Sequence, residues 1–242
     1  MNHLTRPVAE FNPTQAAIRC ICSMATKGLL EELAATHAQR TGVAVSVEAV
    51  GGVEAARRVS AGETFDVVAL ASDAIDKLVA TGKLDGSGKV DLVRSNVGVA
   101  VRSNAARLDI STDDSLRTAV REASSVAYST GPSGVALLAL FKRWGIEAEL
   151  QDRLVQAPPG VPVGALVARG DAALGFQQMS ELIGIEGIDL LGPLPAESQI
   201  TTIFSAAPGI GGTQSEAVRA WLDFMTSDES AEAKRRHGMQ PA

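Results

Sequence analysis

Aromatic residues, cysteines and histidines are all scarce in this sequence. Phe, Trp and Tyr make up 4% of the 242 residues, and there are two cysteines and three histidines. Cys20 and Cys22 lie two apart in a predicted strand, which places them on one face and in poor geometry for a disulfide. No second Cys or His pair follows at the spacing of a zinc site. We expect buried, inert thiols, surface positions for His3, His37 and His237, and neither a metal nor a cofactor.

The sequence also lacks an excess of basic residues and a long apolar run. Its formal net charge is −6, whereas nucleic-acid binders normally carry a basic face. No segment is long and apolar enough to cross a membrane. No apolar stretch of signal-peptide length precedes residue 16. We expect no nucleic-acid partner, no membrane span, and a cytoplasmic location, or a periplasmic one if an export signal has been removed.

Several catalytic and nucleotide-binding signatures are missing as well. There is no GxxxxGK[ST] segment and no GxGxxG fingerprint, which argues against nucleotide and dinucleotide sites. HExxH and GxSxG are also absent, which argues against zinc peptidases and α/β-hydrolases.

What the sequence does contain is a regular alternation of apolar strands and amphipathic helices. The first third predicts strands at 17–22, 43–50 and 65–70 and helices at 27–40, 53–61 and 73–81. Such alternation with short connections is typical of an α/β fold with a parallel sheet. Ligands of such sheets bind beyond the carboxyl ends of the strands.

A second α/β unit is predicted at 98–195. Its strands are expected at 97–101, 125–128, 172–177 and 187–191, and its helices at 113–123, 133–144 and 165–169. A further strand at 200–207 and helices at 215–226 and 228–237 complete the chain.

The segment Tyr128–Val135 is the most informative local feature. A strand runs into a loop rich in Ser, Thr and Gly, and the loop runs into a helix. The first N–H groups of a helix have no acceptor within it, and the helix dipole makes that end partly positive. Hydroxyls from Ser129 and Ser133 add donors, and Gly134 lets the backbone come close, which together suit an uncharged anion site. An ordinary helix cap is an equally good interpretation of this segment taken alone.

The order and spacing of several weak motifs resemble those of the periplasmic molybdate-binding proteins. The matching segments are 23–34, 41–43, 61–68, 167–175, 220–227 and 237–238. The resemblance implies an α/β fold of the type II periplasmic-binding-protein class, with two Rossmann-like lobes joined by two crossing strands. It implies a tail at 1–15, a first lobe at 16–97 plus 196–242, and an inserted second lobe at 98–195. The ligand would lie in the cleft between them.

Two expected side-chain contacts depart from the molybdate-binding pattern. Ser23 resembles the serine after the first strand, but Gly51, Gly52 and Val53 stand where the family has a second serine. Gln178 stands where the family has a tyrosine. Segments 93–102, 177–181 and 192–195 instead resemble a divergent branch that also includes aconitate isomerases. The resemblance therefore favours an anion other than molybdate, and it makes a carboxylate a candidate.

These residues leave a receptor and an enzyme open. A receptor for a small oxyanion or carboxylate would use, by resemblance and position, Ser23, the amides of Gly51, Gly52 and Val53, Tyr128, Ser129, Ser133, Gly134 and Gln178. An isomerase of an unsaturated polycarboxylate needs a base with a tuned pKa and cations for the carboxylates. The candidate cations are Lys27, Arg57 and Arg94, and the candidate bases are Glu54, Asp73, Tyr128 and Glu181.

The alternative for Glu54 and Arg57 is a solvent-exposed position on a helix face, and for Arg94 a structural ion pair at the hinge. A sensor that reports the anion to a partner is a third possible function. We expect a monomer, with an ABC transporter as partner if the protein is exported.

Overall fold

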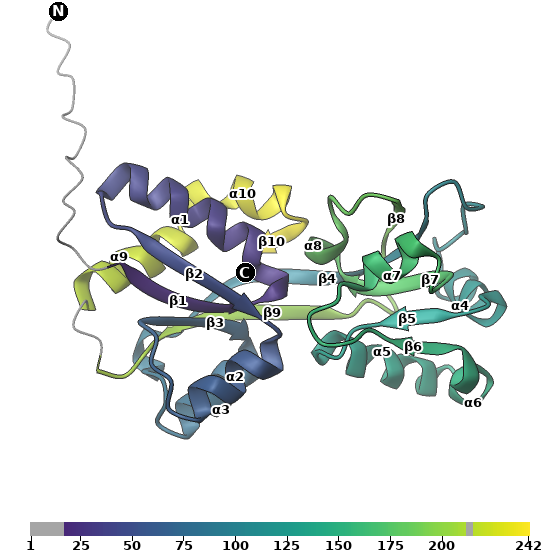
Figure 1. Cartoon of the computed structure of the whole chain (residues 1–242), viewed down its shortest axis with the longest axis horizontal. Coiled ribbons are helices and arrows are strands. Elements are labelled where there is room, and N and C mark those ends of the chain that lie inside the picture. The colour runs from purple at the N-terminus through teal and green to yellow at the C-terminus, as the bar shows by residue number, and fades with distance from the viewer. Residues whose placement is uncertain (1–16, 212–214) are drawn as a thin grey trace, which may run out of the picture.

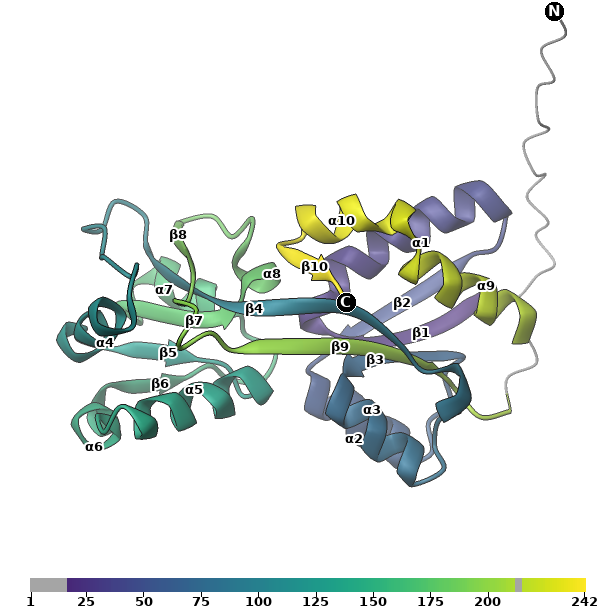
Figure 2. The ribbon, with the colours of Figure 1, turned by 180° about the vertical axis from the view of Figure 1, so that it is seen from behind.

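The computed structural model shows two lobes joined by two long strands (Figure 1). It describes residues 17–211 and 215–242, so the expected tail at 1–15 and His3 lie outside the described residues. Both connecting strands, β4 and β9, run from one lobe into the other, as the view from behind shows (Figure 2).

The first lobe combines the start and the end of the described chain. Its N-terminal elements are β1 (Ile18–Ser23), η1 (Met24–Thr26), α1 (Lys27–Thr41), β2 (Val45–Val50), α2 (Gly52–Ser60), β3 (Val67–Ala71), α3 (Ser72–Ala80) and η2 (Gly86–Gly88). Its C-terminal elements are α9 (Ser215–Thr226), η4 (Asp228–Ser230), α10 (Ala231–Arg236) and β10 (Met239–Pro241). The connecting strands are β4 (Val90–Arg102) and β9 (Thr201–Pro208).

The second lobe lies between β4 and β9 in the chain. Its elements are α4 (Asp113–Glu122), β5 (Val126–Tyr128), α5 (Pro132–Arg143), α6 (Glu147–Leu150), η3 (Gln151–Arg153), β6 (Leu154–Gln156), α7 (Val163–Arg169), β7 (Leu174–Gln178), α8 (Met179–Leu182) and β8 (Ile188–Pro193). The sequence did not predict α6, β6, α8 or β10, which have three or four residues each and show no clear periodicity.

One continuous mixed sheet passes through both lobes, in the order β2-β1-β3-β9-β4-β7-β5-β6. The expected parallel pairing is present within each lobe, where β1 pairs with β2 and β3, and β5 pairs with β6 and β7. An all-parallel sheet is wrong, however, because β9 is antiparallel to both β3 and β4, and β4 is antiparallel to β7. Strand β4 is also much longer than the expected 97–101, since polar residues interrupt its apolar pattern before Val97.

The strand directions make the two lobes face each other. Strands β3 and β4 are both antiparallel to β9, so they run the same way, and β3 ends at Ala71, level with Phe204 and Val93. Strand β7 runs the opposite way and ends at Gln178, level with Val97. The carboxyl ends of the parallel strands in the two lobes therefore point toward each other across about 13 Å of β4. The loops expected to bind a ligand lie on both sides of this gap.

Apolar clusters cover both faces of the sheet in each lobe. In the first lobe Trp221 of α9 packs with Leu29 and Leu30 of α1 on one side of the sheet. On the other side, Val59 of α2 and Ile75 of α3 belong to a second cluster. In the second lobe one cluster is built around Phe141 and Phe176, and the other around residues of α7.

The cysteines are buried, as predicted, but the surface position predicted for His37 is wrong, and His237 is only partly exposed. Cys20 and Cys22 both belong to the cluster around Trp221, and burial raises the pKa of the Cys22 thiol to about 12. His37 is buried and lies edge-on to Trp221, with 5.2 Å between ring centroids. His237 is half-buried, and its Nε2 lies 2.8 Å from Glu32 Oε2. Surface positions were predicted because the sequence near each histidine does not show which distant helix packs against it.

Two isoleucines give a matched test of this packing. Ile75 is fully buried and Ile210 is 58% exposed, so replacing each by alanine removes the same atoms from opposite environments. We expect Ile75→Ala to lower the free energy of unfolding by about 2–5 kcal/mol and Ile210→Ala to change it by less than about 0.5 kcal/mol. Urea unfolding of the three proteins measures the difference. Equal losses in both variants would contradict the arrangement of α3 on the sheet.

Candidate functional site

The first half of the candidate site lies at the end of β1. Ser23 is 6% exposed, and its Oγ lies 3.5 Å from Oγ1 of the fully buried Thr26. Thr26 Oγ1 also donates to the Ser23 carbonyl at 3.2 Å. A Cβ placed on Gly52 would come within 3.6 Å of the Ser23 Cβ. The start of α2 therefore lies directly against Ser23, and the structure brings these two predicted residues together.

The second half lies at the start of α5. The hydroxyls of Ser129 and Ser133 are 3.0 Å apart, so the loop and the first turn share a hydrogen bond. A Cβ placed on Gly134 would lie 1.9 Å from the Ser129 carbonyl oxygen and 3.2 Å from Tyr128 Cδ2. Only glycine permits this approach, as the sequence predicted. We call Ser129, Ser133 and Gly134 the cradle. The half-buried Tyr128 packs against it.

Helix ends around this gap are left without the usual side-chain caps. No side chain caps α1, α2 or α5, and the first turns of α1 and α5 contain no acidic residue. At α4, by contrast, Thr112 and Ser115 form a complete capping box, and Asp113 and Asp114 occupy the first turn. The partly positive ends of α1 and α5 are thus not neutralised by the protein's own side chains.

Gln178 is committed to a network within the protein. It is 3% exposed, its Oε1 accepts from Ser95 Oγ at 2.7 Å, and its Nε2 donates to Thr202 Oγ1 at 2.8 Å. These bonds join β7 to β4 and β9 at the point where the lobes meet. Gln178 lies at the gap, and its amide is hydrogen-bonded to the connecting strands, so its predicted contact with a ligand stays a prediction.

Glu181 on α8 is the predicted acid with the most unusual environment. It is half-buried, and burial raises its pKa to about 7, against the lowering effect of a 2.8 Å hydrogen bond from Gln177 Nε2. Helix α8 lies beside η1, and Met179 and Ile183 approach Gly238 just before β10. The helix that carries Glu181 therefore belongs to the second lobe and contacts the first.

The remaining predicted acids are held in exposed ion pairs. Asp73 lies 3.2 Å from Lys77 within α3. Glu54 receives two hydrogen bonds from Arg57, at 2.6 and 2.7 Å, within α2. Both pairs are of the exposed, weakly stabilising kind. The solvent-exposed interpretation holds for Glu54 and Arg57.

The other predicted residues are exposed. Lys27 begins α1 next to Thr26, and its Nζ lies 4.0 Å from Glu31. Val53 is 66% exposed at the start of α2. Gly51 caps that helix, and a Cβ on it would meet nothing within 4 Å. Arg94 is exposed on β4, opposite Ile203 and Gln240.

Sequence reasoning missed four residues of this region: Thr26, Ser95, Gln177 and Thr202. Thr26 and Thr202 carry no distinctive local signal. Ser95 interrupts an apolar strand. Gln177 directly precedes Gln178 at the end of an apolar strand, so the two amides had to point to opposite faces. That alternation was the available signal for a second functional glutamine.

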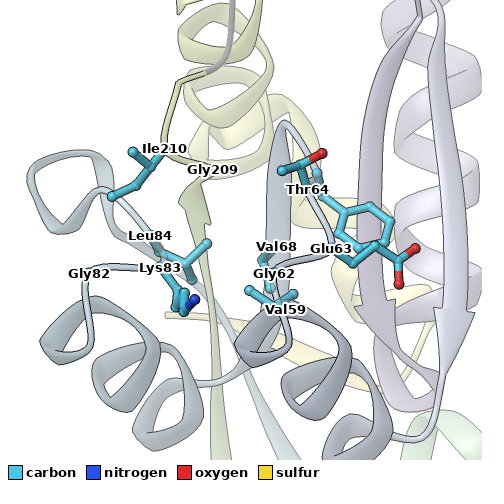
Figure 3. A pocket seen from close by; sticks show the side chains of 11 residues that line it. Val59, Gly62, Glu63, Thr64, Val68, Gly82, Lys83, Leu84, Gly209 and Ile210 are labelled. Carbon is cyan, nitrogen blue, oxygen red and sulfur yellow. The ribbon is translucent and has the colours of Figure 1, made fainter.

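Two surface cavities lie away from the candidate residues. One, of about 190 Å³, is formed by the loops after α2, α3 and β9, with Val59, Lys83 and Ile210 in its lining (Figure 3). The other lies between segments 107–111 and 191–195. Among residues 17–211 and 215–242, no group of three His, Cys, Asp or Glu side chains could hold a metal ion. No helix in the described ranges has the length and apolar character needed to cross a membrane.

Two glycines at the start of α5 give a matched test of the cradle. We expect Gly134→Ala to lower the free energy of unfolding by roughly 2–3 kcal/mol, because the new methyl group would overlap the Ser129 carbonyl. Gly131→Ala should cost less than about 1 kcal/mol, since its Cβ would lie 3.9 Å from the nearest atom. Thermal or urea unfolding distinguishes the two. A harmless Gly134→Ala would show that the loop does not lie on the helix.

Comparison with known proteins identifies the family. The family model described as "Bacterial extracellular solute-binding protein" matches residues 18–240. An aconitate isomerase of Pseudomonas sp is 38% identical over 220 residues, which are 88% of this chain and 84% of that protein. The molybdate-binding protein ModA of Rhodobacter capsulatus is 25% identical over 130 residues, 51% of this chain and 48% of that protein.

Solved structures confirm the predicted fold class. The periplasmic molybdate-binding protein of Azotobacter vinelandii superposes with a TM-score of 0.76 at 19% identity, covering 92% of this chain and 98% of that one. The sulfate-binding protein SubI of Mycobacterium tuberculosis gives 0.76 at 18% identity, with coverage of 94% and 88%. The fold is the type II periplasmic-binding-protein fold. The chain belongs to the family of bacterial extracellular solute-binding proteins, in the molybdate-binding-like branch that also includes an aconitate isomerase.

Proposed function

We propose that this protein binds a small carboxylate anion between its two lobes. The observation that carries the proposal is the pair of uncapped, acid-free starts of α1 and α5 on opposite sides of the gap. Ser23 and Gly52 form one side of the site, and Ser129, Ser133 and Gly134 form the other. Each side offers hydroxyls and backbone N–H groups to one end of the anion.

Three observations favour a carboxylate over a tetrahedral oxyanion. The similarity to the aconitate isomerase covers 220 residues, whereas that to the molybdate-binding protein ModA covers 130. The amide of Gln178, which stands in the position of the molybdate-binding tyrosine, is already hydrogen-bonded to Ser95 and Thr202. Lys27 places an exposed ammonium group at the start of α1, where a second carboxylate of a longer anion would find a partner.

Titration with a panel of anions tests the binding site. The panel contains molybdate, sulfate, citrate, and cis- and trans-aconitate, with binding followed by calorimetry and by the rise in melting temperature. We expect an aconitate isomer to bind, and Ser129→Ala and Ser133→Ala each to raise its Kd roughly tenfold, as for a lost hydrogen bond to a charged group.

Ser111→Ala is the matched control, because Ser111 is exposed in a loop away from the site. Its Kd should equal that of the unmodified protein. Unchanged affinity in both the Ser129 and Ser133 variants would remove the cradle from the proposal. Binding of molybdate or sulfate alone would overturn the preference for a carboxylate.

A second candidate function is isomerisation of the bound anion, and Glu181 is the observation that favours it. A pKa of about 7 suits a group that must accept and return a proton near neutral pH. Exposed ion pairs occupy Glu54 and Asp73. Tyr128 packs behind the cradle. Of the four predicted bases, Glu181 is the one that we propose to act.

The reaction would be an allylic proton transfer. The Glu181 carboxylate removes one proton from the methylene carbon of the unsaturated tricarboxylate, and the C–H electron pair forms a new double bond to the central carbon. The electrons of the old double bond move to the former vinylic carbon, and this carbon takes the proton back from Glu181. One proton leaves and one returns, so no oxidant, reductant or other reactant is needed. The helix ends stabilise the negative charge spread over the substrate during the transfer.

The isomerisation is tested by following cis-aconitate and its trans isomer with purified protein. Because the base must be ionised, we expect kcat/KM to rise with pH up to about 7 and to level off above it. Glu181→Gln should lower kcat roughly 100-fold or more. Glu186→Gln, an exposed residue in the loop after α8, should leave it unchanged. Tight binding without any conversion would leave the receptor function standing and reject the enzyme.

For location and partners, the support comes from the family rather than from the site. The family is described as extracellular, and this supports the periplasmic alternative over the cytoplasmic one. For a pure receptor, we propose delivery of the anion by a monomer to an ABC transporter. Light scattering of the purified protein measures its molar mass in solution, which should equal the mass of one chain.

A further inference from the structure

We propose that Gln177 is a positioning residue that holds one oxygen of Glu181 and leaves the other oxygen for proton transfer. This inference rests on the proposed isomerase function, in which Glu181 is the base. Gln177 has no counterpart among the residues predicted from the sequence. It is 4% exposed, so its side chain is largely shielded from bulk water.

The orientation of the Gln177 amide follows from its two partners. Its Oε1 accepts from the backbone N–H of Val163 at 2.8 Å, and its Nε2 donates to Glu181 Oε1, also at 2.8 Å. A backbone N–H can only donate, so the oxygen of the amide must face Val163 and the NH₂ group must face Glu181. The usual uncertainty about which way a glutamine amide points is thereby removed.

Core packing fixes the position of Val163, whose N–H donates to Gln177. A Cβ on Gly175 would meet Val167 Cγ2 at 2.6 Å and Val163 Cγ1 at 2.9 Å, so α7 lies in close contact with β7. Val163 and Val167 are fully buried. The N–H that anchors Gln177 is therefore held by the core of the second lobe. The position of Glu181 Oε1 is fixed through Gln177 by the same core.

The hydrogen bond also biases the protonation of Glu181. A donor facing a carboxyl group favours its ionised form, and so the Gln177 bond lowers the pKa of Glu181 while burial raises it. Without Gln177 the burial effect would act alone, and the carboxyl would remain protonated at higher pH. Gln177 therefore keeps Glu181 available as a base near neutral pH.

Other charged groups near α8 do not replace this effect. Strand β7 and η1 carry no titratable side chain. The titratable and charged residues on the other packed elements and the adjoining segments are Lys27, Asp91, Arg94, Arg102, Arg169, Glu186, Asp189, Arg235, Arg236 and His237. The pKa of Glu181 has two causes, burial and the Gln177 hydrogen bond.

The two neighbouring glutamines thus have different tasks on opposite faces of β7. Gln178 joins the connecting strands through Ser95 and Thr202. Gln177 joins the start of α7 to Glu181. Replacing Gln177 should move a pH profile, which a residue with a merely structural role would not do.

Two variants test this role in the full-length protein. Gln177→Met keeps the approximate size of the side chain and removes both of its hydrogen bonds, to Val163 and to Glu181. Gln177→Glu keeps an acceptor for the Val163 N–H, so it retains the fold if the methionine variant does not, and it places a second carboxyl group against Glu181. Gln199→Met is the matched control, because it removes a comparable bond, from Nε2 to the Leu194 carbonyl, that involves neither Val163 nor Glu181.

The first measurement is the titration of the Glu181 side-chain carboxyl carbon by NMR, assigned by comparison with Glu181→Gln. The second is the pH dependence of kcat/KM for aconitate. We expect Gln177→Met to raise the pKa of Glu181 by about one unit. Gln177→Glu should raise it further, because a second carboxylate disfavours ionisation. The rising limb of the profile should shift to higher pH by the corresponding amounts. Activity at pH 6 should fall roughly tenfold, and the control should match the unmodified protein.

The carbon titration separates this inference from the proposed function. A protein that fails to isomerise aconitate rejects the isomerase, while the titration still measures whether Gln177 controls Glu181. An unchanged Glu181 titration in both Gln177 variants would overturn the positioning role even if the enzyme is active. A loss of activity without any shift of the pH profile would also overturn it.

Discussion

The pairing of β4 with β9 is the constraint on which the geometry of this protein depends. These two strands are hydrogen-bonded to each other over Val90–Asn96 and Thr201–Ala206, and each also pairs with the strands of a lobe. Their register decides that β3 ends level with Val93 while β7 ends level with Val97. A shift of the register would turn side chains to the opposite face, and the Ser95–Gln178–Thr202 network opposes such a shift. The distance and the direction in which the two sets of loops face each other follow from this pairing.

The N–H groups at the starts of two helices determine which kind of ligand suits the gap. At α4 the protein satisfies the first N–H groups with its own side chains. At α1 and α5 no side chain does so. Backbone carbonyls accept from the N–H groups of Lys27 and Gly134, and the other free N–H groups of these first turns are left to solvent or a ligand. An anion that replaces water at both ends gains from two partly positive dipoles at once. In the proposed function, binding would therefore favour the arrangement in which the two lobes approach each other, which is a hinge closure.

Local features of the site could be predicted from the sequence, and cooperative ones could not. The cradle was predictable because a strand, a Ser/Gly loop and a helix follow one another within eight residues, from Tyr128 to Val135. Glu181 could be named as a candidate base, but its pKa depends on burial by segments distant in sequence. Gln178 was expected as a ligand donor, and its engagement with Ser95 and Thr202 requires three strands that only the fold brings together. His37 was misplaced for the same reason, since the aromatic residues that cover it come from α9.

The crossing strands also set an order in which the chain can become complete. Strand β9 separates β3 from β4 in the sheet, and Trp221 fills the core beneath α1. Strands β1, β2 and β3 can pair with one another as soon as they are made, whereas β3 and β4 each lack a neighbour until β9 has been made. The segment from β5 to β8 can meanwhile assemble around Phe141 and Phe176, because domains tend to fold as units during synthesis. The second lobe can therefore form before the pairing of β9 with β3 and β4 joins the sheet across both lobes.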